Sequence, residues 1–318
     1  MRHVLRIGMT LVVALGLMAT SIAAPAAAQH DKPTITIGSK DFTESILLAE
    51  IVGVLLEDNG YTVELQTNLG GTAVVHQALV NDEVDIYVEY TGTGLLAILG
   101  MDLPEAASDG ATPASGAATG QDRVYDIVKE EYQEQFGITW LEPWGFNNTY
   151  AIAVTQETAD EYGLEKISDL QGVAGDLTLG ATQEFLVRPD GLPGMTELYG
   201  IEFGSEQGLD PGLVYAAVEN GDVDVITATA TDGRIPALDL VVLEDDKNFF
   251  PPYYAAPVVD TELLEQNPEI ADILNQLAGE IDDETMADLN YRIDEGGEEP
   301  NDVARAFLEE RGLIGGDD

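Results

Sequence analysis

Hydrophobic and polar residues follow two different periods along the chain, and these periods predict a succession of strands and helices. Residues 34–38 (TITIG) alternate and stop at a glycine, which predicts a short strand. Residues 42–59 repeat apolar side chains on one helical face and end before Gly60, which predicts a helix. The pattern continues with a strand at 61–66, a helix at 72–80 and a strand at 84–88. This alternation predicts an α/β domain with a largely parallel sheet.

The same kind of pattern returns in the second half of the chain. A strand at 150–154 opens a second α/β run that ends near residue 244. The remaining chain is mainly helical, near 260–278, 282–293 and 300–312. Residues 102–121 are rich in Ala, Gly, Ser and Pro, so we expect a flexible surface insertion there.

One internal similarity relates the two halves. The segment NDEVDI at 81–86 recurs as NGDVDV at 220–225, an offset of 220 − 81 = 139. The helical patterns before the two segments also match in type. The similarity predicts two lobes of like construction, with the carboxyl ends of their strands facing a shared cleft, where open α/β sheets bind ligands. Coincidence is the alternative, because short helix-to-strand turns of this kind are common.

The first 28 residues have the features of an export signal. A basic start is followed by an apolar run and by three alanines at 26–28. This order predicts a signal peptide over 1–28, and a retained membrane anchor is the alternative. The chain has no cysteine and therefore no site for a lipid anchor. We expect a periplasmic protein that is secreted through its signal peptide and carries no lipid anchor.

Composition narrows the classes of partner and chemistry. The chain carries 59 acidic and 13 basic side chains, a formal charge of −46, which disfavours nucleic acid as a partner. Hydrophobic residues make up 45% of the chain, enough for a packed core. The lack of cysteine excludes disulfides and thiol catalysis. Because bases are so rare, a basic residue inside a glycine-rich or apolar motif is a candidate for function.

Several motifs together resemble one protein family. The segments at 37–44 (IGSKDFTE), 70–72 (GGT) and 87–93 (YVEYTGT) resemble those of the glycine betaine/choline-binding proteins of osmoprotectant ABC importers. Further matching segments lie at 145–151 (GFNNTYA), 188–191 (RPDG), 232–234 (DGR) and 251–253 (PPY). The resemblance implies an α/β, two-lobed periplasmic-binding-protein fold of type II, with a hinge and a ligand cleft between the lobes. It also implies no catalytic activity and no cofactor or metal.

The resemblance also implies a domain organisation and partners. We expect lobe 1 to begin at 29–143, lobe 2 to span 144–248, and residues 249–318 to return through the hinge and complete lobe 1 with helices. The expected partners are a small quaternary ammonium solute and the membrane permease of an ABC importer. We expect the protein to be a monomer.

The ligand's chemistry selects the candidate site residues. A quaternary ammonium ion cannot donate hydrogen bonds, so aromatic rings must hold it through cation–π attraction. The carboxylate of a betaine needs an ammonium group, a guanidinium fork and a hydroxyl. By resemblance, the ring positions fall on Tyr90, Tyr150, Tyr253 and Thr229, and the carboxylate positions on Lys40, Thr93 and Arg188.

Position 229 departs from the family pattern, because members with a complete box carry tyrosine there and this chain has Thr229. The missing ring predicts weaker binding of glycine betaine, or a bulkier or more polar solute. Choline and carnitine are therefore alternatives. Tyr254 or Trp144 could supply the missing wall instead.

Each cationic or hydroxyl candidate also has a purely structural alternative. Lys40 could be a solvated loop lysine beside one of many carboxylates. Arg188 could clamp Asp190, and Thr93 could cap a following helix. A different class of protein, a secreted hydrolase that uses two carboxylates, also stays open among 59 acidic residues, although GxSxG and HExxH motifs are absent.

Overall fold

The computed structural model describes residues 32–104 and 120–315. The predicted signal peptide and residues 105–119 of the predicted insertion lie outside the described residues. Within the described ranges, no helix combines the length and the apolar character needed to span a membrane.

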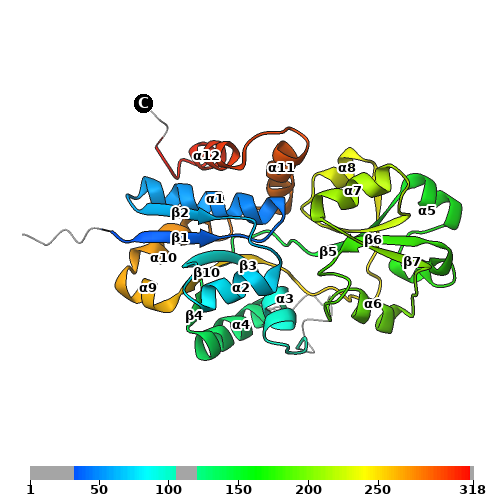
Figure 1. Ribbon diagram of the computed structural model, residues 1–318, viewed down its shortest axis with the longest axis horizontal. Coiled ribbons are helices and arrows are strands. Elements are labelled where there is room, and N and C mark those ends of the chain that lie inside the picture. The colour runs from blue at the N-terminus through cyan, green and yellow to red at the C-terminus, as the bar shows by residue number, and fades with distance from the viewer. Residues whose placement is uncertain (1–31, 105–119, 316–318) are drawn as a thin grey trace, which may run out of the picture. The chain divides into compact units, whose positions relative to one another are not determined.

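Among the described residues, the strands form two five-stranded sheets (Figure 1). The first has the order β2-β1-β3-β10-β4, with β1 Thr34–Gly38, β2 Thr62–Gln66, β3 Ile86–Tyr90, β4 Ile138–Trp140 and β10 Ala255–Asp260. The second has the order β7-β6-β8-β5-β9, with β5 Tyr150–Thr155, β6 Thr178–Thr182, β7 Ser205–Leu209, β8 Val225–Thr229 and β9 Leu240–Leu243. We call the regions around these sheets the first and second lobes.

Helices surround both sheets. In the first lobe they are α1 Thr43–Asp58, α2 Thr72–Val80, α3 Thr91–Thr93, α4 Gly120–Phe136, α9 Thr261–Gln266, α10 Glu269–Leu274, α11 Asp283–Asp294 and α12 Pro300–Glu310. In the second lobe they are α5 Gln156–Tyr162, α6 Leu192–Tyr199, α7 Pro211–Glu219 and α8 Arg234–Ala237. A π-helical turn at Gly94–Ile98 follows α3, and short 3-10 helices occur at Ile167–Leu170, Ala174–Asp176 and Asn275–Leu277.

The predicted helical region at 260–278 is confirmed, and the structure divides it into two α-helices followed by a short 3-10 helix. Its first part is α9 and its second part is α10, with Asn267 and Pro268 between them. Proline has no N–H to donate within a helix, and it disfavours helical geometry in the residue before it. The proline therefore divides this region into two helices.

The prediction of a largely parallel sheet needs correction, because both sheets are mixed. β1 pairs in parallel with β2 and β3, whereas β10 lies antiparallel between β3 and β4. In the second lobe, β5 lies antiparallel between β8 and β9. The physical reason is where the chain enters: Ala255 pairs with Tyr90 and Tyr150 pairs with Thr229, at the carboxyl ends of β3 and β8. A strand that begins beside the carboxyl end of its neighbour can extend only toward the neighbour's amino end, so the two strands are antiparallel.

The internal repeat is confirmed by the structure. The bounds of α2 and β3, increased by 139, are the bounds of α7 and β8. The tertiary contacts repeat as well, because Asp85 Oδ2 accepts a hydrogen bond from the Thr36 amide at 2.6 Å and Asp224 Oδ2 accepts one from the Thr178 amide at 2.8 Å. The two lobes thus share one construction, and together they confirm the two-lobed α/β fold.

Each sheet of the described structure has an apolar core on both faces. In the first lobe, α1 and α12 cover one face and α2 and α4 the other (Figure 1). Helix α1 is apolar on most sides, with Leu47, Ile51 and Leu55 fully buried. Burying such a side chain stabilises the fold by about 1.5–3 kcal/mol. The start of α1, which lies just after the candidate site residue Lys40, is therefore firmly fixed.

Candidate functional site

Two segments, 141–149 and 244–254, connect the lobes and contact each other. The Tyr253 amide donates a hydrogen bond to Asn147 Oδ1 at 2.7 Å, and the Asn148 amide donates one to the Tyr253 carbonyl at 3.1 Å. Residues 147–148 and 253 are thereby held together where the lobes meet. The lobe boundaries at 143/144 and 248/249 stay a prediction.

A cavity of about 690 Å³ lies beside these segments and is lined by both lobes. All seven residues proposed from the sequence line it: Lys40, Tyr90, Thr93, Tyr150, Arg188, Thr229 and Tyr253. They come from distant parts of the chain, so only the fold brings them together. Among the described residues, no group of three or more His, Cys, Asp or Glu side chains is arranged to hold a metal ion.

The three tyrosines line one side of the cavity, and two of them lie at the ends of strands. Tyr90 ends β3 and Tyr150 begins β5, whereas Tyr253 lies in the returning segment. The rings of Tyr150 and Tyr253 lie edge to face, with centroids 5.6 Å apart and an interplanar angle of 82°. The Phe42 ring lies 6.1 Å from that of Tyr90 and also lines the cavity. Apolar ring faces and edges therefore dominate this side of the site.

Gly92 fixes the distance between the Tyr90 loop and Tyr253. A Cβ atom at position 92 would lie 2.8 Å from the Pro252 carbonyl oxygen and 2.9 Å from Tyr253 Cδ1. Both distances are shorter than normal van der Waals contacts, so a side chain at this position would push the segments apart. The glycine of the Thr91-Gly92-Thr93 motif is thus required for the close packing of the ring.

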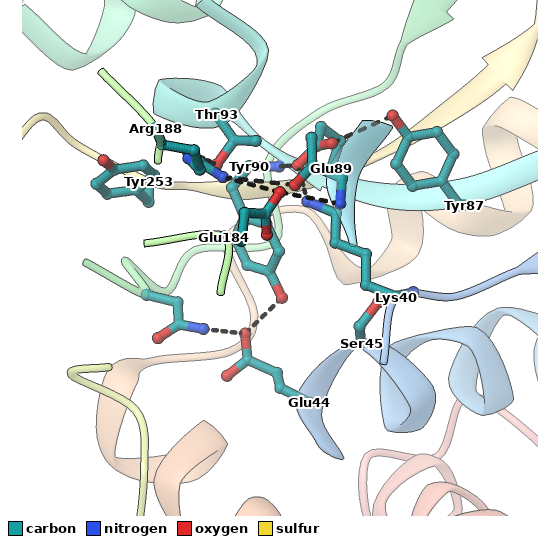
Figure 2. Close-up of polar contacts among 12 residues, drawn as sticks. Lys40, Glu44, Ser45, Tyr87, Glu89, Tyr90, Thr93, Glu184, Arg188 and Tyr253 are labelled. Atoms are coloured by element: carbon teal, nitrogen blue, oxygen red, sulfur yellow. Dashed lines mark hydrogen bonds and ion pairs between the residues drawn. The ribbon is translucent and has the colours of Figure 1, made fainter. Parts of the chain in front are cut away.

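Lys40 is buried, with 3% of its side chain exposed, and its Nζ lies 2.5 Å from Oε1 of the fully buried Glu89 (Figure 2). The alternative of a solvated loop lysine is therefore wrong. Nζ also lies 5.1 Å from the ring centroid of Tyr90. The other carboxylate oxygen of Glu89 accepts a hydrogen bond from the Tyr87 hydroxyl at 3.2 Å. The sequence motifs did not point to Glu89, although an acidic residue inside a buried strand is a signal that could have identified it.

Arg188, from the second lobe, contacts the first lobe at this site. Its guanidinium group donates hydrogen bonds from Nε and Nη2 to the carboxylate of Asp190. Nη2 also donates to Thr93 Oγ1 of the first lobe at 3.1 Å. The predicted ion pair between Arg188 and Asp190 is therefore confirmed, and Arg188 also lines the cavity. Burial alone would lower the pKa of Arg188, but Tyr150 and Asp190 raise it above its ordinary value. The side chain of Thr93 makes no capping hydrogen bond at the following helical turn, so the capping alternative is wrong.

Thr229 lies directly opposite Tyr150 in the β5–β8 pair. Directly opposed residues of an antiparallel pair project from the same face of the sheet. Trp144 is fully buried in the core of the first lobe, and neither Trp144 nor Tyr254 is among the described residues that line the cavity. The prediction that one of them replaces the missing ring is therefore not supported. The additional aromatic lining residues are Phe42 and Tyr215.

Glu44, in the first turn of α1, is a lining residue that the sequence motifs did not single out. Its carboxylate is buried and accepts hydrogen bonds from Tyr90, Asn148, Thr231 and Asn290 (the Tyr90 bond is shown in Figure 2). Burial raises the pKa of Glu44, and the hydrogen bonds from these four donors oppose that rise. The available signal was an acidic residue in the first turn of α1, shortly before the apolar run at 46–49.

The chain is similar to known transport proteins over nearly its whole length. Residues 33–310 match the OpuAC family, described as the substrate binding domain of ABC-type glycine betaine transport systems. The carnitine transport binding protein OpuCC of Listeria monocytogenes is 38% identical over 309 residues, 96% of each chain. The ergothioneine transport permease/ergothioneine binding protein EgtU of Helicobacter pylori is 34% identical, over 91% of this chain and 49% of the relative. A crystal structure described as a glycine betaine/carnitine/choline ABC transporter aligns with a TM-score of 0.68 at 36% identity, over 88% of this chain and 99% of that one.

The chain therefore belongs to the family of substrate-binding domains of ABC-type glycine betaine transport systems. The resemblance predicted from the sequence motifs is confirmed. Because the family consists of solute-binding proteins and not of enzymes, the alternative of a secreted hydrolase is excluded.

Proposed function

We propose that this protein captures a small trimethylammonium carboxylate outside the cytoplasm, in a periplasm, and delivers it as a monomer to an ABC permease. The observation that carries the proposal is the meeting of three tyrosine rings and two cationic side chains on the wall of one cavity between the lobes. Hinge closure of two such lobes around a ligand is a known means of capture.

In this proposal the methylated cation rests against Tyr90, Tyr150 and Tyr253. A ring face attracts a desolvated cation by about 2 kcal/mol. The edge-to-face contact between Tyr150 and Tyr253 sets their ring planes at 82°, so they form two walls of a corner and not one flat surface. A trimethylammonium head is roughly spherical and fits a corner better than a plane.

The carboxylate of the solute binds Lys40, Thr93 and Arg188. Lys40 already pairs with Glu89, and Arg188 already pairs with Asp190. The ammonium group of Lys40 has three N–H donors and uses one of them on Glu89, so two remain for a ligand. Nη1 of Arg188 makes only longer contacts, to Thr72 Oγ1 at 3.4 Å and to Glu184 Oε1 at 3.7 Å, and a ligand carboxylate can replace these. Because Lys40 and Arg188 are each balanced by a protein carboxylate, they need no net negative charge from the ligand, and a zwitterion adds no net charge to the site. This arrangement favours betaines over choline, which has a hydroxyl where a betaine has its carboxylate.

Thr229 determines which betaine fits best. The small side chain leaves space beside Tyr150 and adds a hydroxyl group near the cage. A solute with more atoms between or around its charged ends, such as carnitine or ergothioneine, can use this space. Glycine betaine cannot fill it, so we expect glycine betaine to bind more weakly than a larger trimethylammonium carboxylate.

Isothermal titration calorimetry with glycine betaine, carnitine, ergothioneine and choline tests the proposal. Lys40→Met should weaken the binding of every carboxylate ligand about tenfold or more, with a smaller effect on choline. Lys129→Met is the matched control, because Lys129 forms an exposed pair with Glu142 away from the cavity. Failure of all four solutes to bind the wild-type protein would refute the proposed function.

A further inference from the structure

The carboxylate of Glu44 has an arrangement of partners that sets it apart from the other buried acids at this site. Oε1 accepts from the Tyr90 hydroxyl at 2.8 Å and from Asn148 Nδ2 at 2.8 Å. Oε2 accepts from the Thr231 hydroxyl and from Asn290 Nδ2, the latter at 3.0 Å. An ionised carboxylate offers about four acceptor positions, so these four donors saturate it.

The orientation of two asparagines fits an ionised carboxylate at Glu44. Both turn their NH₂ groups toward the carboxylate, and Oδ1 of both Asn148 and Asn290 is buried without a hydrogen-bond partner in the described structure. Leaving a buried amide oxygen unpaired costs about 1–3 kcal/mol. Hydrogen bonds to an ionised acceptor are about twice as strong as those between neutral groups, which offsets that cost.

The charge of Glu44 differs from the other buried charges beside the cavity because its hydrogen-bond donors are all neutral. Lys40 balances Glu89, and Arg188 balances Asp190. The four donors to Glu44 are two hydroxyls and two amides. Glu44 therefore contributes one uncompensated negative charge within this group, and the Tyr90 phenol links that charge to the cage.

We propose that Glu44 strengthens the cation–π attraction of the cage by polarising the ring of Tyr90. A phenol that donates its proton to a carboxylate gains electron density on the ring, since hydrogen-bonded groups polarise one another in a low-dielectric interior. The negative ring face that attracts a cation is then enhanced. Glu44 acts through Tyr90, so it is a positioning and polarising residue that selects for positive charge in the ligand. This inference rests on the proposed function.

Glu44→Gln provides the test, because it keeps the size of the side chain and removes its charge. The variant is compatible with the fold, since Asn148 can rotate its unpaired Oδ1 to accept the new amide N–H, while Asn290 keeps its hydrogen bond to the Thr231 carbonyl. The ligand pair is glycine betaine and its isostere 3,3-dimethylbutanoate, in which carbon replaces the cationic nitrogen, so that the head group is uncharged and the carboxylate is kept. Calorimetry measures the betaine, and displacement followed by ligand-observed NMR measures the weaker isostere.

We expect Glu44→Gln to weaken betaine about tenfold and the isostere by less than about twofold. In a Tyr90→Phe background the same change should weaken betaine only about twofold, because the phenol link is absent. Asp58→Asn is the matched control, since Asp58 is exposed at the end of the same helix and is not among the described residues that line the cavity, and it should change betaine affinity by less than about twofold.

Equal losses for betaine and isostere would overturn the inference, because a purely structural role affects both ligands alike. An undiminished effect of Glu44→Gln in the Tyr90→Phe background would also overturn it and indicate direct Coulomb attraction in place of ring polarisation. If the wild-type protein does not bind betaine or its larger relatives at all, the proposed function fails first, and the two failures are thereby distinguished.

Discussion

Replacing Thr229 with tyrosine should restore a fourth ring to the cage. Thr229 and Tyr150 are direct partners across β8 and β5, so the new ring would project from the sheet beside that of Tyr150. The cavity of about 690 Å³ offers room for it. One added ring contributes about 1–2 kcal/mol to the binding of a methylated cation, which corresponds to about 5–30-fold in affinity for glycine betaine. Larger solutes should lose affinity, because the ring occupies the space that they use.

Calorimetric titration of glycine betaine and carnitine into both proteins measures this change in preference. Thr229→Val is the control, because it removes the hydroxyl at nearly constant size and adds no ring. We expect the valine variant to leave glycine betaine affinity within about twofold. If Thr229→Tyr folds with an unchanged melting temperature and glycine betaine still binds no more tightly, position 229 does not form a cage wall, and the reasoning about solute choice is refuted.

Three further variants test other parts of the site. Gly92→Ala places a methyl group 2.8 Å from the Pro252 carbonyl oxygen, so we expect the free energy of unfolding in denaturant melts to fall by about 1–3 kcal/mol and betaine to bind more weakly. A variant with wild-type stability and affinity would contradict the close packing. Arg188→Lys loses the planar guanidinium group that reaches both Asp190 and Thr93, so the affinity for betaine should fall about tenfold or more and the affinity for choline should fall less. Equal losses for the two ligands would argue against a contact between Arg188 and the ligand carboxylate. Because the pKa of Glu44 is raised above its ordinary 4.5, the stabilisation it gives is complete at low pH and is lost as pH rises through the raised value. The unfolding free energy of wild type relative to Glu44→Gln should therefore fall as pH rises above 4.5, the ordinary pKa of a glutamate, and a constant difference would contradict the shift.

Much of the site could be predicted from local sequence, because short motifs place side chains at the ends of strands. Tyr90 and Thr93 follow a buried strand, and the rarity of bases singled out Lys40 and Arg188. The repeat offset of 139 relates Thr229 to Tyr90 in the sequence alone, and β3 and β8 do end at those two residues. These positions depend on the periodicity of single elements, which sequence reports well.

The partners of the cationic residues could not be predicted in the same way. Glu89 lies 49 residues from Lys40 in the chain, and Glu44 lies 246 residues from Asn290. The sequence has 59 acidic residues, and although Glu44 and Glu89 stand in unusual local contexts, nothing in the sequence pattern shows which side chains they contact. Burial decides which charges need partners, and burial is a property of the assembled fold.

The sequence by itself determined the α/β alternation, the duplication of the lobes and the kinds of side chain available for a methylated cation and a carboxylate. These follow from local periodicity and from chemistry that each residue carries wherever it lies. The tertiary structure decided the antiparallel direction of β5 and β10, the pairing of Lys40 with Glu89, and the four donors around Glu44. Those features arise when segments far apart in the chain enter one low-dielectric space, where each buried charge must find its hydrogen bonds.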